Sequence, residues 1–153
     1  MKKKDVRLYN VLFPVWMLVM LPSIWYIVIP GNFIIDSLVL ILVMKVLKLE
    51  NRFEFYQMHI LPVFLLGFLA DLLAAVPMWL SVYFWEDLGG PYGDSPLLTV
   101  PGVILGAALI WVFNYFISFR KCDPVLRKKL ALTFAIATAP YTFLIPSGWL
   151  YGF

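Results

Sequence analysis

One carboxylate stands in the middle of an apolar run. Asp71 lies within LLGFLADLLAAV, residues 65–76, in which every other side chain is uncharged. A bare carboxylate near the centre of a lipid bilayer costs about 3 kcal/mol or more, and acids in such places are rare and usually functional. The side chain must therefore be protonated, hydrogen-bonded, hydrated or paired. Asp71 predicts a proton or cation site or, alternatively, a protonated acid that joins two helices by hydrogen bonds.

Three further polar residues are candidates for contact with an ion or substrate at Asp71. Asp36 follows a PGN turn predicted at residues 30–32, so we expect it near the outer surface. There it would form the outer mouth of a path to Asp71 or simply anchor the turn. Asn114 and Tyr141 lie in other apolar segments and are candidates to face the acid, although Asn114, six residues before Arg120, is expected closer to the inner side.

A pair of carboxylates within reach of one water would indicate an aspartyl-type enzyme. An α-helix rises about 1.5 Å per residue, which places Asp36 about 5 Å below the outer surface and Asp71 about 20 Å below it. A difference in depth of about 15 Å argues against such a dyad. An intramembrane aspartyl-type enzyme is therefore the third of the functional hypotheses, and we expect no enzyme.

The other residues that could do chemistry form no recognisable motif. His59 and the single cysteine, Cys122, are far apart in the sequence, and no ligand spacing joins them to further donors. We therefore expect no metal site and no cofactor. The sequence contains no Gly-rich phosphate loop and no Ser or Cys nucleophile with a companion His.

The elements that must position these residues are apolar helices. The chain has 153 residues, 63% of them hydrophobic and 14% charged, whereas soluble domains average about 25% charged residues. Each bilayer crossing needs about 20 residues. We predict one all-α integral membrane domain over residues 1–153, in the cell membrane. Its five spans are expected at about 8–30, 33–48, 57–85, 97–119 and 130–150.

The basic residues predict the orientation of this bundle. If segment 33–48 crosses, all twelve Lys and Arg lie on one side, and the two opposite loops, 30–32 and 86–96, contain none. Basic residues favour the cytoplasmic side of a membrane. The N-terminus is therefore predicted to be cytoplasmic and the C-terminus extracytoplasmic. Since the basic clusters flank apolar segments, the expected partner is the lipid bilayer and not nucleic acid.

Small residues mark the predicted helix contacts, because helices in lipid pack where small side chains let their backbones approach. The candidates are Gly67, Ala74, the GxxxG pair Gly102 and Gly106, and the alanines Ala131, Ala135 and Ala139. Residues three and four apart share a helix face. Asp71 shares its face with Gly67 and Ala74 and is predicted to point at another helix.

The leading functional hypothesis is a small transporter or ion-conducting protein with Asp71 as its central polar residue. The alternative is a non-catalytic accessory or assembly subunit of a larger membrane complex, in which the polar residues serve helix recognition. Five short spans leave little room for a transport pathway within a single chain. Transport would therefore require a homo-oligomer or a membrane partner protein, with the GxxxG face as one contact.

Overall fold

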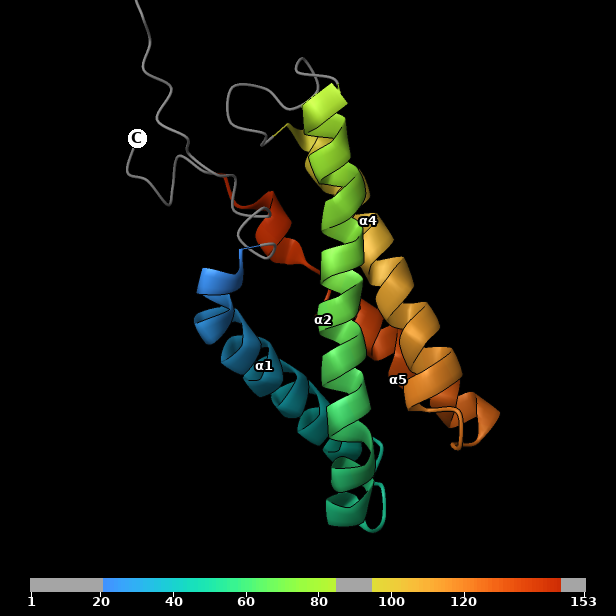
Figure 1. Cartoon of the computed structure of the whole chain (residues 1–153). Helices are drawn as coiled ribbons and strands as arrows, with labels where there is room; N and C mark the ends of the chain where they lie inside the picture. The colour runs from blue at the N-terminus through green and yellow to red at the C-terminus, as the bar shows by residue number, and fades with distance from the viewer. Residues whose placement is uncertain (1–20, 85–94, 147–153) are drawn as a thin grey trace, which may run out of the picture.

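The computed structural model describes residues 21–84 and 95–146, without the side chains of Val82 and Tyr83. Every regular element in these ranges is a helix (Figure 1). The elements are η2 (Pro22–Ile24), α1 (Trp25–Val46), α2 (Arg52–Phe84), α4 (Pro96–Phe113), the π-helical turn η3 (Asn114–Ser118), α5 (Pro124–Ala137) and the 3-10 turn η4 (Tyr141–Leu144).

Three helical stretches are long and apolar enough to cross a membrane. They cover Pro22–Val46, Arg52–Ser81 and Pro96–Ser118. Large apolar side chains point outward from all three, including Leu38, Leu61 and Ile104, as expected for helices that face acyl chains. The described part of the chain is thus consistent with an all-α membrane protein, and the predicted spans 57–85 and 97–119 correspond to α2 and to α4 with η3.

The predicted turn at residues 30–32 is wrong. These residues lie inside α1, which runs without a break from Trp25 to Val46 with Pro30 in its interior. In lipid a helix is the only way for a single segment to satisfy its backbone polar groups, and proline is tolerated there. The expected hairpin between spans 8–30 and 33–48 is therefore absent. Residues 1–20 lie outside the described ranges, so a further span there and the side of the N-terminus stay predictions.

The last predicted span, 130–150, is not one helix. α5 begins at Pro124, where Asp123 Oδ2 accepts hydrogen bonds from the backbone N–H groups of Val125 (3.0 Å) and Leu126 (3.4 Å). It has 14 residues, fewer than the about 20 needed for a crossing. The chain then breaks at residues 138–140, because a proline at position 140 has no N–H to donate and its ring clashes with the preceding turn. We call residues 138–140 the helix break.

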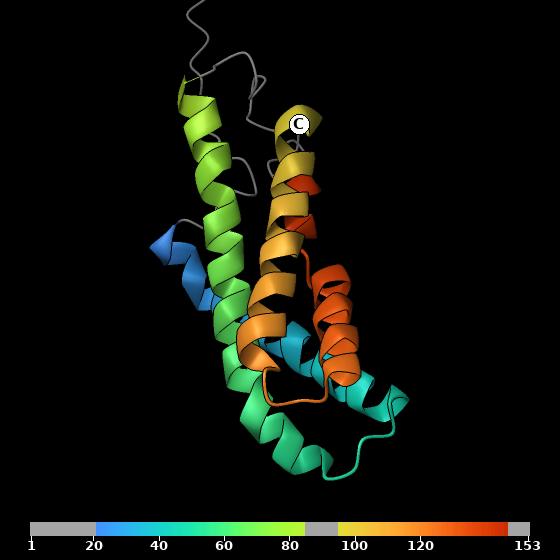
Figure 2. The same cartoon turned by 90° about the vertical axis from the view of Figure 1, so that its right-hand side faces the viewer.

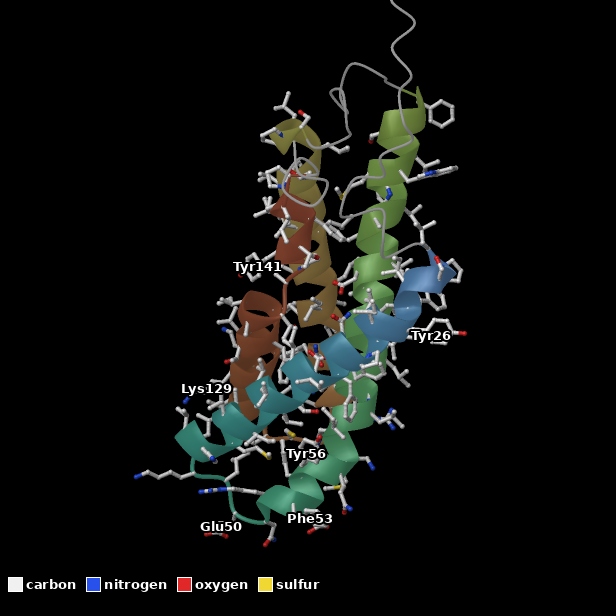
Figure 3. The ribbon with its side chains drawn as sticks, turned by 90° about the vertical axis from the view of Figure 1, so that its left-hand side faces the viewer. Tyr26, Glu50, Phe53, Tyr56, Lys129 and Tyr141 are labelled. Carbon is white, nitrogen blue, oxygen red and sulfur yellow. The ribbon has the colours of Figure 1, made fainter. Side chains whose placement is uncertain are left out.

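α2 is the central helix, with α4 antiparallel to it and α5 beside α4 (Figures 1 and 2). α1 crosses α2 obliquely, which Figure 3 shows from the side of α1. Ring contacts join Trp25 to Phe68 (5.4 Å) and Phe33 to Phe64 (5.5 Å). The N-terminal end of α1 therefore meets the middle of α2 and not its far end.

All eight Lys and Arg of the described residues lie at one end of the bundle, where α1 and α4 end and α2 and α5 begin. They are Lys45, Lys48, Arg52, Arg120, Lys121, Arg127, Lys128 and Lys129. We call this the basic end. Figure 3 labels Phe53, Tyr56 and Lys129 toward it and Tyr141 farther from it.

Candidate functional site

A cavity of about 190 Å³ lies between α1, the middle of α2 and the helix break. We call it the acid cavity. Its walls are Asn32, Ile35 and Asp36 from α1, Gly67, Phe68 and Asp71 from α2, and Ala137, Thr138, Ala139, Pro140, Tyr141 and Thr142 around the break. The three elements that form it are far apart in the sequence.

The acid cavity brings two carboxylates together. Asp36 is 5% exposed, and a Cβ atom added to Gly67 would lie 3.6 Å from its Oδ2 atom. This carboxylate therefore rests against α2 about one turn before Asp71. Asp71 Oδ1 is buried without a hydrogen-bond partner among the described residues. The two groups are close enough to interact electrostatically.

The predicted difference in depth between the two acids is wrong. It assumed that a helix starts near residue 33, which would have left Asp36 one turn from the outer surface. Because α1 already begins at Trp25, Asp36 lies well inside the helix. The oblique crossing then sets this part of α1 against the middle of α2, where Asp71 lies.

The surroundings of the two acids are negative. None of the residues that line the acid cavity is Lys, Arg or His. α5 also ends at the cavity, and the last carbonyls of a helix carry a partial negative charge. Such a site can hold a proton or a cation. The bound positive charge would offset the negative charge of the two acids, which water screens only weakly in this buried position.

Tyr141 lies at the acid cavity, as predicted, with its hydroxyl already engaged. The hydroxyl donates to the backbone carbonyl of Ile136 at 2.5 Å. Thr138 makes a similar bond, from its Oγ1 to the carbonyl of Phe134 at 2.8 Å. Both donors satisfy carbonyls in the last turn of α5, so the broken end of the helix is stabilised by its own side chains.

Asn114 does not reach the acid cavity, contrary to the prediction. It is buried in η3, where its Nδ2 donates to the carbonyl of Ile110 at 3.0 Å. Its Oδ1 atom has no partner among the described residues. The reason is depth, because η3 lies next to the basic end while Asp71 lies near the middle of α2.

The GxxxG pair packs within the chain. A Cβ atom at Gly102 would overlap Met78 Sδ, and one at Gly106 would lie 2.5 Å from Pro140 Cγ and 3.4 Å from Ala74 Cβ. Both glycines are buried. α2 and the helix break therefore already cover this face within one chain, and its expected use as the contact between copies or with a partner stays a prediction.

The remaining small residues divide between two settings. Ala131 and Ala135 are buried on the face of α5 that also carries Phe134. Ala139 is buried as well, but it belongs to the helix break and lines the acid cavity. Gly67 has only the Asp36 carboxylate near its absent Cβ, so it makes room for an acid and not for a backbone.

The structure also pairs two residues that showed no relation in the sequence. His59 Nε2 lies 3.7 Å from Cys122 Sγ, so the expectation of a cysteine without a companion His is wrong. The two are 63 positions apart, and spacing rules do not reach that far. The only signal in the sequence is that each is predicted near the same membrane surface.

Within the described ranges, no group of three or more His, Cys, Asp or Glu side chains is arranged to hold a metal ion. Comparisons with protein-family models, with curated sequences and with solved structures find no match for this chain.

Proposed function

We propose that this membrane protein moves protons or small monovalent cations across the bilayer, with Asp71 and Asp36 as the shared binding site. One observation carries the proposal: two acids line one cavity at the middle of a membrane helix, and no basic side chain lines it with them. A structural acid would need a hydrogen-bond partner, and Asp71 Oδ1 has none among the described residues.

The helix break supports the same proposal. Secondary transporters bind their coupling ions where membrane helices are discontinuous, and the C-terminal ends of half-helices help to coordinate Na⁺ or H⁺. Here α5 ends at Ala137, and the break continues along the wall of the acid cavity to Tyr141. The carbonyl end of α5 and the two carboxylates thus approach one space from different elements.

The basic end is proposed to face the cytoplasm. Every Lys and Arg of the described residues lies there, and such asymmetry sets orientation in most membrane proteins. Single cysteines replacing Leu97 and Lys128, in a Cys122→Ser background, are expected to label from opposite faces of the membrane. Labelling from the same face would contradict this orientation.

Transport by a bundle of this size also calls for a homo-oligomer or a membrane partner protein. The acid cavity beside α1 is partly open at the surface of the described helices. Because Gly102 and Gly106 are used within the chain, the proposed contact lies on another surface.

Flux through purified protein in liposomes tests the proposal. Vesicles loaded with a pH-sensitive dye are driven by a potassium diffusion potential, with and without a Na⁺ gradient. We expect wild-type protein to conduct protons or Na⁺, and Asp71→Asn to lower the flux about tenfold or more, since the amide keeps the shape and loses the titratable charge.

Glu54→Gln is the matched control, because it makes the same chemical change at an exposed position of the same helix. It should leave the flux unchanged. Wild-type vesicles that conduct no better than empty ones, or an Asp71→Asn variant as active as Glu54→Gln, would contradict the proposal and favour an accessory subunit.

The shared cavity also favours a second candidate, an intramembrane aspartyl-type hydrolase. Two carboxylates that share one water can activate it for attack on a peptide bond. In that case Asp36→Asn and Asp71→Asn should each abolish cleavage of a fluorogenic transmembrane peptide in detergent. Absence of cleavage by wild-type protein over a panel of such peptides would remove this candidate.

A further inference from the structure

A second pocket lies at the basic end, between the start of α2, η3 and the turn that follows it. Its volume is about 490 Å³, within the range of about 300–1,000 Å³ usual for small-molecule sites. Phe55, Met58 and Ile117 form apolar wall, whereas Arg120 and Lys121 bring positive charge. We call it the thiol pocket, because Cys122 lines it beside His59.

The hydrogen bonds of His59 fix its tautomer. Its Nδ1 lies 2.8 Å from the backbone carbonyl oxygen of Phe55. A carbonyl only accepts, so Nδ1 carries the proton, and Nε2 of the neutral ring has a free lone pair. Nε2 is the atom that lies 3.7 Å from Cys122 Sγ. The thiol therefore donates to the imidazole, which is the arrangement of a nucleophile with its general base.

The ring of His59 is held in this orientation by its neighbours. It is 7% exposed and stacks between Phe55 (4.1 Å) and Phe119 (5.4 Å). A base whose rotamer is locked by packing and by a carbonyl is positioned before any ligand arrives.

The thiol itself needs such a base. Burial raises the pKa of Cys122, and the charge of Arg127 only partly opposes this. The resting group is therefore a neutral thiol at pH 7, while the thiolate is the nucleophilic form. Proton transfer to His59 is the direct way to obtain it.

Ser118 adds an independent sign of a ligand. It is 7% exposed and lines the thiol pocket, yet its Oγ has no hydrogen-bond partner among the described residues. An unpaired buried hydroxyl is costly. Because Oγ is shielded from the pocket in this conformation, a carbonyl oxygen of a bound ligand would accept the missing bond after the Ser118 side chain rotates toward the pocket.

We propose that Cys122 is an acyl-acceptor site, which takes a long-chain fatty acyl group from coenzyme A with His59 as its base. Apolar walls suit the acyl chain, and the two basic side chains suit the phosphates of the carrier. The chemistry balances without an oxidant or an external energy source. The sulfur attacks the thioester carbon as His59 Nε2 takes the thiol proton, and Ser118 donates to the developing oxyanion. The bond to the carrier sulfur then breaks, and that sulfur takes the proton from His59, so that one thioester replaces another.

Labelling of the full chain in nanodiscs with alkyne-tagged palmitoyl-coenzyme A tests this proposal. We expect a hydroxylamine-sensitive adduct that Cys122→Ser abolishes, formed about tenfold or more faster than on a free peptide of residues 118–126 in the same lipid. His59→Gln should slow labelling about a hundredfold at pH 7, within the usual contribution of a general base. This deficit should shrink as pH rises, because the thiolate then forms without help.

Two further readouts separate catalysis from a merely structural role. Ser118→Ala should slow labelling without changing its pH profile, and wild-type protein should prefer the palmitoyl over the acetyl thioester by about tenfold. Labelling no faster than that of the peptide overturns the proposal even if a variant fails to fold. So does a His59→Gln variant that folds and matches the wild type at every pH, or one whose deficit is the same at every pH.

Discussion

One stripe of α2 meets two different partners, and the two halves of the stripe differ in what they allow. Toward the end of α2 away from the basic end, Met78 packs against Gly102 and Ala74 against Gly106, and Pro140 also contacts Gly106 so closely that an added methyl group would overlap its ring. One and two turns earlier, Asp71 and Gly67 face the acid cavity. Small residues on the same stripe of α2 therefore form a close helix contact with α4 in one half and border the open acid cavity in the other half.

The oblique crossing of α1 explains the difference. α1 contacts mainly the first half and the middle of α2, through pairs such as Phe33 with Phe64 and Ser37 with Tyr56. α4 runs antiparallel along α2 (Figure 2), and its glycines pack against the half of the stripe away from the basic end. Where the coverage by α1 ends and the helix break begins, the packing leaves space, and the acids occupy that space. A small residue thus indicates a close approach only where a partner backbone is present.

The largest expected effect comes from combining changes at the two acids. Asp36→Asn and Asp71→Asn should each lower flux about tenfold or more, and the double variant should lose no more than the more damaging single variant. When two groups act on the same bound ion, the effects of changing each group on the flux are not additive. The measurement is dye-reported flux in liposomes for all four proteins. Losses that multiply would indicate two separate sites.

Methyl groups added to the two halves of the stripe should have different effects on stability. Gly106→Ala should destabilise the fold by about 1–3 kcal/mol, because the rigid ring of Pro140 cannot move aside. Gly102→Ala should cost less, since Met78 is flexible. Gly67→Ala should be neutral or stabilising by up to about 1 kcal/mol, because alanine is the better helix former and its Cβ would make ordinary contacts.

Denaturant unfolding of the three alanine variants in one detergent, followed by circular dichroism, gives this ranking. If Gly67→Ala proves as destabilising as Gly106→Ala, the half of the stripe at the acid cavity is packed as tightly as the half that faces α4.

The smallest effect is expected at the edge of α1. Ser37 Oγ and the Tyr56 hydroxyl lie 2.9 Å apart and join α1 to α2 near the basic end. Ser37→Ala and Tyr56→Phe should each cost about 0.5–1.5 kcal/mol of unfolding free energy. A double-mutant cycle on unfolding should show that the two changes are coupled. Full additivity would mean that this bond does not hold α1 in its oblique position.

Part of this architecture follows from local pattern. Long apolar runs predicted α2 and α4 within a few residues, because a hydrocarbon environment forces any such run to be helical. The neighbours of Asp71 predicted that the acid faces protein. Local pattern gave a wrong prediction at residues 30–32, where the PGN sequence indicated a turn. Proline and glycine end helices more readily in water than in lipid.

The sequence by itself determined that the protein is helical and membrane-embedded, that its basic residues gather at one end and that one acid lies deep among small residues. Only the tertiary structure decided that Asp36 lies with Asp71 in one cavity and that Asn114 does not. It also decided that the glycine pair packs within the chain and that His59 lies beside Cys122. The physical reason is that periodicity and hydropathy act over neighbouring residues. The angle between α1 and α2 and the break after α5 arise from packing between segments far apart in the chain.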